Sequence, residues 1–365
     1  MKIKRIEPIA VRLPLKKPIK RSQGELRTSD NLIVRIESDG AVGWGEAGSA
    51  PNVTGELPEG MVAAVRYVAP YLEGLPLEDV DRAAAVMNHA LSGNHGAKAA
   101  VEMALHDALG KALGKPACEL LGGKRRGRVP ALRYIASGDT AKDAAEAARL
   151  KSEGYVAYKI KLSGKWEQEV ERTRRVCEAL GKGVLVSADV NQGWTVEQAV
   201  NYVRAVADTT LEFLEQPVAA EDLAGMASVV AASRVKIACD EGMQSVADLE
   251  RHHEMRAAHG TSLKLIKLGG MRPLYQTALL CEKLGMKVNL SCKIAESGIA
   301  SAAVLQLAAA LPSLDWGVSL TSQYLAEDVL VQPLRFENGE ALIPSGPGLG
   351  IDVDEARVRR FSANQ

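Results

Sequence analysis

The stretch that decides the fold is residues 156–189, which read VAYKIKLSGKWEQEVERTRRVCEALGKGVLVSAD. A short apolar segment ends in Lys159 and Lys161, an amphipathic segment of helical period follows, and a second apolar segment ends in Asp189. This alternation implies parallel strands joined by helices. The same rhythm recurs, and the predicted strands are residues 130–135, 156–161, 184–189, 211–215, 235–240, 263–266, 288–290 and 316–320.

Eight strand–helix units in roughly 200 residues predict an α/β fold in the form of a closed (β/α)8 TIM-type barrel. A doubly wound open sheet is the alternative, but that fold usually carries a glycine-rich phosphate loop after its first strand. The barrel segment of this sequence contains no such loop. The pattern therefore favours the barrel.

The segments that flank the barrel predict an α+β capping domain. Residues 33–46 have the pattern of a β-hairpin, residues 58–121 have helical periodicity, and residues 336–340 predict a second hairpin that returns toward the N-terminal region. We expect three parts, namely a cap at 1–125, the barrel at 126–325 and a C-terminal segment at 326–365 that joins the cap.

Two polar loops are expected to cover the barrel mouth and to select the substrate, at residues 20–30 and 48–60. Changes in these loops, at Arg27 or Glu56 for example, are expected to alter which carboxylate is accepted.

Composition excludes several classes of function. Lysine plus arginine number 45, as do aspartate plus glutamate, so the formal net charge is zero. Nucleic acids and anionic membranes both require a basic surplus, so neither is an expected partner. Apolar runs stay well short of the roughly 18 residues that span a bilayer, and no secretory signal is visible. Five scattered cysteines predict buried thiols, and we expect a cytoplasmic protein.

Polar side chains end the predicted strands, at the face where such barrels carry their active sites. They are Lys159 and Lys161 on the second strand, Asp189 on the third, Glu215 on the fourth, Asp240 on the fifth and Lys264 on the sixth. From Lys161 onward, successive groups are 24 to 28 residues apart. A single such residue is usually a helix cap or a rim charge, but an ordered series indicates one common site.

The residue types in this series make chemical sense together. Three converging carboxylates repel one another unless a cation lies among them. Oxygen ligands without histidine or cysteine favour a hard ion, so we expect one Mg²⁺ per subunit. Lysines on opposite sides of that ion are expected to have depressed pKa values, as a general base or acid requires.

At these positions the sequence resembles the enolase superfamily and, within it, the muconate lactonizing enzyme subgroup. The resemblance covers essentially the whole chain. It includes residues 43–46 (GWGE), residues 97–100 (AKAA) with Asp107, residues 264–270 (KLIKLGG) and residues 346–351 (GPGLGI).

The resemblance implies a role for each residue of the series. Asp189, Glu215 and Asp240 are implied to hold Mg²⁺. Lys161 and Lys264 are implied to move a proton on opposite faces of the substrate, while Lys159 offsets the negative charge that develops.

Further residues enter with less direct roles. Asn191 and Glu241 are expected to support the metal ligands, and Glu296 matches a position at the family's active-site rim. Lys267 competes with Lys264 for the catalytic role. His252 and His253, on the helix after the fifth strand, are expected to be exposed.

The implied activity is abstraction of the proton next to a carboxylate through an enolate intermediate. A racemase or epimerase of an amino-acid derivative, or a cycloisomerase, is the main hypothesis, acting on a small-molecule carboxylate in a homo-oligomer. A dehydratase of a hydroxylated amino acid such as a 3-hydroxyproline is the alternative. Two other hypotheses are an inactive barrel used as a binding module and a Schiff-base aldolase that uses Lys161.

One departure from the family bears on the substrate. Dipeptide epimerases of the subgroup carry Asp-x-Asp at the end of the eighth strand, whereas residues 316–324 (WGVSLTSQY) contain no carboxylate. A dipeptide is therefore not the expected substrate. Trp316 and Tyr324 are expected to pack against a smaller one.

Overall fold

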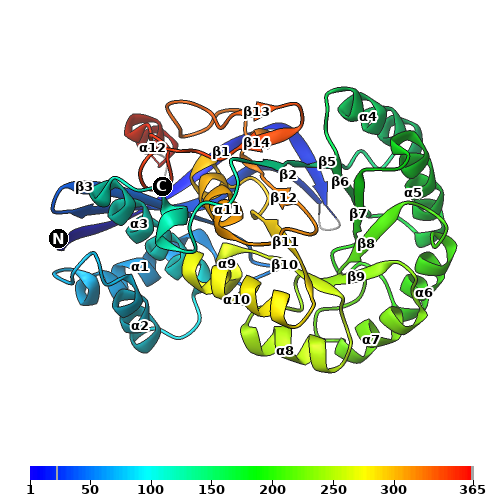
Figure 1. Ribbon diagram of the computed structural model, residues 1–365, viewed down its shortest axis with the longest axis horizontal. Helices are drawn as coiled ribbons and strands as arrows, with labels where there is room; N and C mark the ends of the chain where they lie inside the picture. Colours follow the sequence, from blue (N-terminus) through cyan, green and yellow to red (C-terminus); the bar gives the residue numbers. More distant parts are fainter. Residues whose placement is uncertain (22–23, 363–365) are drawn as a thin grey trace.

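Eight parallel strands form a barrel in the computed structural model, which describes residues 1–21 and 24–362 (Figure 1). Neighbouring strands pair in chain order, and a bridge between Ala131 and Val318 brings the first strand next to the last. The predicted barrel is therefore confirmed. Its strands are β5 (Leu132–Ile135), β6 (Ala157–Lys161), β7 (Leu185–Asp189), β8 (Leu211–Glu215), β9 (Lys236–Cys239), β10 (Gly260–Leu263), β11 (Lys287–Ser291) and β12 (Val318–Ser319).

The sixth strand differs from its prediction. It was expected at residues 263–266, but β10 ends at Leu263 and the apolar residues after Lys264 form a helical turn. The strand itself reads GTSL, and Thr261 and Ser262 are buried with hydrogen bonds to Cys239 O and Asn289 Oδ1. These small polar side chains are buried against the neighbouring strands, so an apolar pattern does not mark β10.

Helices surround the barrel on its outer side (Figure 1). They are α4 (Thr140–Ser152), α5 (Trp166–Leu180), α6 (Val196–Ala205), α7 (Leu223–Ala232), α8 (Val246–Glu254), α9 (Leu265–Leu268), α10 (Met271–Lys283) and α11 (Gly298–Ala310). Several begin at a polar cap: Asp139 and Asp222 each accept a hydrogen bond from a first-turn amide, and Thr195 forms a capping box with Gln198. These caps set the residue at which a strand-to-helix loop ends and the next helix begins.

The cap lies at one side of the barrel and contains an antiparallel sheet with three helices (Figure 1). Its elements are β1 (Ile3–Arg21), β2 (Gly24–Ser38), β3 (Ala41–Gly48), α1 (Pro58–Leu72), α2 (Val80–Ala90) and α3 (His95–Leu113). The predicted hairpin is present as β2 and β3, which turn between Ser38 and Ala41.

The predicted loop at residues 20–30 is wrong for the residues that are described. Lys20 pairs with Glu25 and Arg21 with Gly24, so β1 and β2 continue as a two-stranded arm; residues 22–23 lie outside the described part of the chain. Backbone pairing holds such an arm together without an apolar pattern. The arm reaches the segment after β12, where Leu15 bridges Leu325.

Helix α3 lies between the cap sheet and the barrel, and residues 96–110 are all buried. A β-carbon on Gly45 would stand 1.9 Å from the carbonyl oxygen of Ala100, so only glycine permits this approach of β3 to α3. Asp107 accepts hydrogen bonds from the amides of Trp44 (2.9 Å) and Leu349 (2.8 Å). Three motifs that are distant in sequence therefore pack together.

The remaining elements connect the C-terminal segment to both parts. They are the 3-10 helices η1 (Ala117–Leu120) and η2 (Ser322–Tyr324), with β4 (Arg128–Pro130), β13 (Phe336–Glu337), β14 (Glu340–Leu342) and α12 (Glu355–Ser362). The predicted hairpin is present, but β14 pairs with β4, the short strand that directly precedes the first barrel strand in the chain. Helix α12 returns to the cap, where Arg359 forms an ion pair with Glu7.

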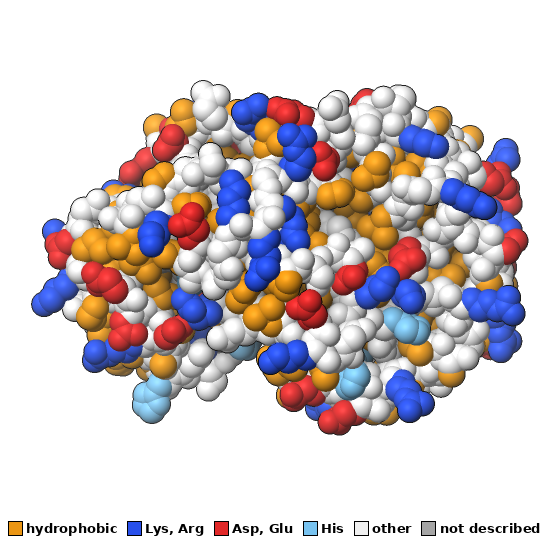
Figure 2. Space-filling view, viewed as in Figure 1, with side chains coloured by type: hydrophobic (Ala, Val, Ile, Leu, Met, Phe, Trp, Pro, Cys, Tyr) orange, Lys and Arg blue, Asp and Glu red, His pale blue; other side chains and the backbone are white. Residues whose placement is uncertain are grey.

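The surface agrees with the balanced charge of the sequence. Figure 2 shows basic and acidic side chains interspersed over the visible face. Within the described residues, no helix combines the length and apolar composition that crossing a bilayer requires.

Candidate active site

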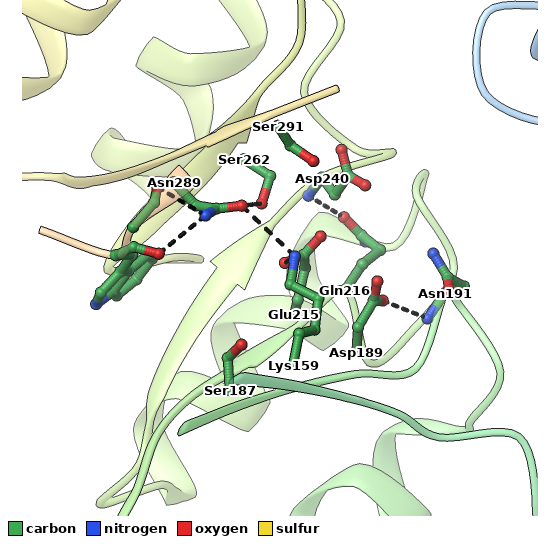
Figure 3. Close-up of polar contacts among 12 residues, drawn as sticks. Lys159, Ser187, Asp189, Asn191, Glu215, Gln216, Asp240, Ser262, Asn289 and Ser291 are labelled. Carbon is green, nitrogen blue, oxygen red and sulfur yellow. Dashed lines mark hydrogen bonds and ion pairs between the residues drawn. The ribbon is translucent and has the colours of Figure 1, made fainter. Parts of the chain in front are cut away.

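The strand ends bring the predicted polar groups together. Register places Lys161 beside Asp189 and Asp189 beside Glu215, while Asp240 follows β9 directly and Lys264 follows β10 directly. Figure 3 shows Lys159, Asp189 and Glu215 on adjacent strands with Asp240 beyond them. All lie at the carboxyl ends of parallel strands, the face where barrels of this kind carry active sites.

Each of the three carboxylates forms an ion pair with at least one lysine. Lys161 Nζ lies 2.5 Å from Asp189 Oδ2, and Lys159 Nζ lies 2.6 Å from Glu215 Oε2. Asp240 bonds to Lys264 through Oδ2 and to Lys267 through Oδ1. The carboxylates are each about 1% exposed, so these charges interact in a region with little water.

Burial and charge move the pKa values in opposite directions. Burial raises the pKa of Glu215, and the negative charges of Asp189 and Asp240 raise it further against the effect of Lys159. Burial would also raise the pKa of Asp240, but Lys264 and Lys267 hold it well below its usual range.

While the lysines contact the carboxylates, their pKa values are shifted in the opposite direction to the one expected beside a bound cation. Burial alone would lower the pKa values of Lys161 and Lys264, but Asp189 and Asp240 respectively raise them above the usual lysine value. Each ammonium is stabilised by the carboxylate that it contacts, and this effect outweighs the cost of burial.

The carboxylate oxygens of this site are the type of ligand that a hard divalent cation prefers. Glu241 lies beside Asp240, its Oε2 has no hydrogen-bond partner, and burial with the charges of Asp240 and Asp189 raises its pKa to about 7. This excess of buried carboxylate oxygen suits Mg²⁺. As the side chains lie, however, no group of three or more His, Cys, Asp or Glu in the described chain is arranged to hold a metal ion. A cation would have to displace the lysines from these oxygens.

A cavity of about 440 Å³ opens above these groups. Its described lining includes Lys159, Lys161, Asp189, Glu215 and Lys264 from the barrel, together with Ala50, Asn52 and Val53 from the cap. The segment between β3 and α1 therefore closes part of the mouth. Lys267, by contrast, is fully buried outside the cavity lining and donates to Ser262 O and Asp240 O.

Asn191 and Glu241 lie where support for the carboxylates was expected. The Asn191 amide donates to Asp189 Oδ1 (3.0 Å), and its side chain accepts from Lys161 (3.1 Å) and donates to Glu241 (3.0 Å). One asparagine thus fixes the relative positions of a carboxylate and a lysine.

Sequence reasoning missed the roles of two buried amides. Gln216 Oε1 accepts from the amides of Asp240 (2.9 Å) and Gly242 (3.1 Å), which orients the loop after β9. Asn289 lies beside Lys159 in the barrel interior and donates to Trp316 O (2.9 Å) (Figure 3). The role of Gln216 could have been predicted, because it directly follows the predicted site residue Glu215. The sequence around Asn289 contains no motif that would indicate its role.

Trp316 does not contact the cavity, so its predicted role with the substrate is wrong. It is fully buried, stacks on Phe213 at 4.1 Å between ring centroids, and donates to Glu212 at the start of β8. Both neighbours belong to β8 and precede Glu215, the residue at its carboxyl end. Tyr324 does line the cavity, and it stacks on Tyr134 at 5.4 Å.

Three other expectations need correction. Glu296 lies behind the cavity wall rather than at its rim, where it accepts from the amides of Gly48 and Lys293. Glu56 accepts from the first amides of α3, so it caps that helix. His252 is buried, at 3% exposed, because the face of α8 that carries it packs on the barrel.

Most of the chain matches the two domains of one known protein family. Residues 5–122 match the N-terminal domain of the mandelate racemase / muconate lactonizing enzyme family, and residues 142–357 match its enolase C-terminal domain-like partner. A chloromuconate cycloisomerase of Cupriavidus necator is 32% identical over 368 residues, or 99% of either chain. An N-succinyl-L-Arg/Lys racemase of Bacillus cereus is 29% identical over 377 residues, which cover 100% of this chain and 99% of the racemase.

Solved structures agree. A muconate lactonizing enzyme from Pseudomonas fluorescens, complexed with muconolactone, superposes with a TM-score of 0.94 at 32% identity and covers 99% of both chains. The N-succinyl Arg/Lys racemase from Bacillus cereus also gives 0.94, at 29% identity over 99% of this chain and 98% of that one.

The chain belongs to the enolase superfamily, in its muconate lactonizing enzyme subgroup. Its relatives are cycloisomerases and a racemase, so the protein is an isomerase of this superfamily. The hypothesis of an inactive binding module is therefore wrong. Members of the superfamily use a divalent metal, in agreement with the kind of donors gathered here.

Proposed function

We propose that this isomerase racemises or epimerises an amino-acid derivative by moving the proton next to its carboxylate. The observation that carries the proposal is the placement of Lys161 and Lys264, which line one cavity from strands four positions apart in an eight-stranded barrel. A planar intermediate between them presents one face to each lysine. A proton that leaves from one face and returns to the other inverts the carbon.

Charge around the carbon supports proton removal. Removal of the proton leaves negative charge on the substrate carboxylate, and preorganised positive groups stabilise such charge best where water is excluded. Lys159 lines the cavity, is 2% exposed and is held by Glu215, so it provides a fixed positive charge in the cavity wall. Asp189, Glu215 and Asp240 would hold Mg²⁺, which when bound supplies further positive charge to the carboxylate oxygens.

The lysines must lose their carboxylate partners to act as bases. Each ion pair stabilises the ammonium form, as the raised pKa values of Lys161 and Lys264 indicate. A cation bound to the same oxygens would compete with both ammonium groups and lower their pKa values. The proposal therefore predicts that proton exchange depends strictly on a divalent ion.

Cycloisomerisation is the second candidate function. It is supported by the relatives named as muconate and chloromuconate cycloisomerases, which are 31–33% identical over 99% of this chain. That reaction would also use a lysine to move a proton next to a carboxylate. The two functions therefore differ in substrate more than in the groups that act.

Deuterium exchange in D₂O tests the proposal. A panel of N-acyl amino acids, proline derivatives, muconate and lactones is incubated with the enzyme and Mg²⁺, and deuterium at the carbon next to the carboxylate is measured by NMR. We expect exchange with inversion for an amino-acid derivative. Cyclisation of muconate would favour the second function, and loss of water from a hydroxyproline would indicate a dehydratase.

Variants of the two lysines sharpen this test. Lys161→Ala and Lys264→Ala should each abolish conversion, while each retains exchange of one enantiomer. Lys182→Ala, at an exposed lysine outside the cavity, is the matched control and should behave as the unmodified enzyme. Full conversion by both site variants would contradict two-base catalysis.

A further inference from the structure

Tyr134 lies in the cavity wall next to one of the two proposed proton-transfer groups. The strand register pairs Tyr134 on β5 with Lys159 on β6, and both side chains line the cavity. Lys161 follows two residues later on the same face of β6, and its Nζ lies 5.4 Å from the centroid of the Tyr134 ring. An ammonium group within about 6 Å of a ring centroid is attracted to the negative face of that ring.

The Tyr134 ring is itself held in place. It stacks on Tyr324, with the ring centroids 5.4 Å apart and the ring planes 8° from parallel. The Tyr134 amide donates to the Tyr324 hydroxyl at 3.1 Å, and the Arg133 guanidinium lies 5.6 Å from the centroid of the Tyr324 ring. The segment after β12 therefore supports the ring, which gives Lys161 a fixed surface to lie on.

Lys161 needs such a surface because its polar partners depend on one carboxylate. Its side chain is 22% exposed, whereas that of Lys159 is 2% exposed, so packing restrains Lys161 less. Its hydrogen bonds go to Asp189 and to Asn191, and the Asn191 amide is bonded to Asp189 in turn. The proposed function requires Lys161 to leave Asp189. The Tyr134 ring is a contact that does not depend on that aspartate.

The lysine on the opposite side of the cavity has no such support. Lys264 forms an ion pair with Asp240, and no aromatic ring lies against its ammonium group in the described part of the chain. The two lysines are therefore held differently. Loss of the Tyr134 ring should affect proton transfer at one face of the substrate and spare the other.

We infer that Tyr134 is a positioning residue, whose aromatic ring holds the Lys161 amine toward the face of the substrate that it serves. The inference rests on the proposed function, which assigns that face to Lys161. In the step concerned, the neutral amine takes the proton from carbon and becomes an ammonium group, while the electron pair of the broken C–H bond stays on the substrate as the enolate. The ring limits the positions of a flexible side chain, and its negative face stabilises the positive charge that develops on Nζ.

Proton exchange measured separately for each enantiomer tests the inference. Both enantiomers of a substrate found in the D₂O panel are incubated with saturating Mg²⁺, and the initial rates of proton loss give kcat for each. Lys161→Ala identifies the enantiomer whose exchange requires Lys161. Tyr134→Leu should lower kcat for that enantiomer about tenfold relative to kcat for the other.

Tyr134→Phe is the conservative variant, because it keeps the ring and removes only the hydroxyl. It should restore the ratio of the two kcat values to that of the unmodified enzyme. A ring that merely fills the cavity wall would slow both enantiomers equally in Tyr134→Leu, and an unchanged ratio would overturn the inference. A ratio that falls as far in Tyr134→Phe as in Tyr134→Leu would assign the effect to the hydroxyl and would also overturn it.

A second measurement needs no substrate. Lysine labelled with ¹³C at Cε reports on Lys161 by NMR, and the signal that disappears in Lys161→Arg is assigned to it. In the enzyme with Mg²⁺, the ring current of Tyr134 should displace the Hε signal of Lys161. Tyr134→Leu should remove this displacement and Tyr134→Phe should keep it. The same signal in all three proteins would show that the ring does not hold the amine.

The outcomes also separate the two proposals. If Lys161→Ala removes exchange of one enantiomer while Tyr134→Leu keeps the ratio, the inference fails and the proposed function stands. If Lys161→Ala leaves exchange of both enantiomers intact, or if no amino-acid derivative exchanges, the proposed function fails and the inference fails with it.

Discussion

Lys264 and Lys267 both contact Asp240, yet their surroundings predict opposite effects of mutation. Lys267 is fully buried and satisfies Asp240 and Ser262, so Lys267→Met should destabilise the fold by about 3–5 kcal/mol. Lys264 reaches the cavity, and Asp240 keeps Lys267 when Lys264 is lost. Lys264→Met should therefore leave stability within about 1 kcal/mol but reduce exchange of one enantiomer at least 100-fold. Urea unfolding and NMR exchange measure the two effects, and the reverse pattern would make Lys267 the catalytic lysine.

Individual residues could be predicted where chemistry marks them. The site carboxylates and lysines come at the ends of recognisable strands. Because the carboxyl ends of all strands in such a barrel lie on one face, the sequence alone predicts that these side chains lie close together. Trp316 and His252 could not be placed in this way. Whether each faces a cavity, solvent or core depends on partners such as Phe213 and the barrel wall, which are distant in sequence.

At the scale of elements, the contact between β3 and α3 depends on the absence of a side chain. Gly45→Ala would place a methyl group 1.9 Å from a backbone oxygen that cannot rotate away, so we expect a loss of about 3 kcal/mol. Gly60→Ala in the first turn of α1 is the control, because its added methyl meets nothing within 4 Å. That change should be neutral or stabilising by up to about 1 kcal/mol. Similar urea midpoints for the two variants would contradict the close packing.

The elements that could be predicted are those whose pattern reflects burial. Most barrel strands were found because both of their faces are covered, which makes them short apolar runs. The pattern places β10 too late in the chain because the strand carries two small polar residues, Thr261 and Ser262, which are buried and hydrogen-bond to the neighbouring strands. The sequence predicts a loop where β1 and β2 form the arm, because backbone pairing leaves no pattern in a polar sequence.

For the whole molecule, cap and barrel share their apolar cores and should unfold together. Trp44 and Met103 of the cap belong to the cluster that fills the barrel, and Ile266 of α9 belongs to the cluster of the cap. Variants that retain only Trp44 or only Trp316 report on the cap and the barrel separately by fluorescence. We expect coincident urea transitions for the two, whereas separate midpoints would show that the parts unfold independently.

The same two reporters predict how metal binding reaches the cap. A ligand that binds only the folded state stabilises the whole cooperative unit, by about 2.7 kcal/mol when its concentration is 100 times Kd. Saturating Mg²⁺ should therefore raise both midpoints equally, although the carboxylates lie in the barrel, and EDTA should reverse the shift. Glu215→Gln should abolish it, whereas Glu171→Gln, at an exposed carboxylate on α5, should not. A shift confined to Trp316 would mean that the cap closes the cavity without sharing the stability of the barrel, and no shift at all would remove Asp189, Glu215 and Asp240 as a metal site.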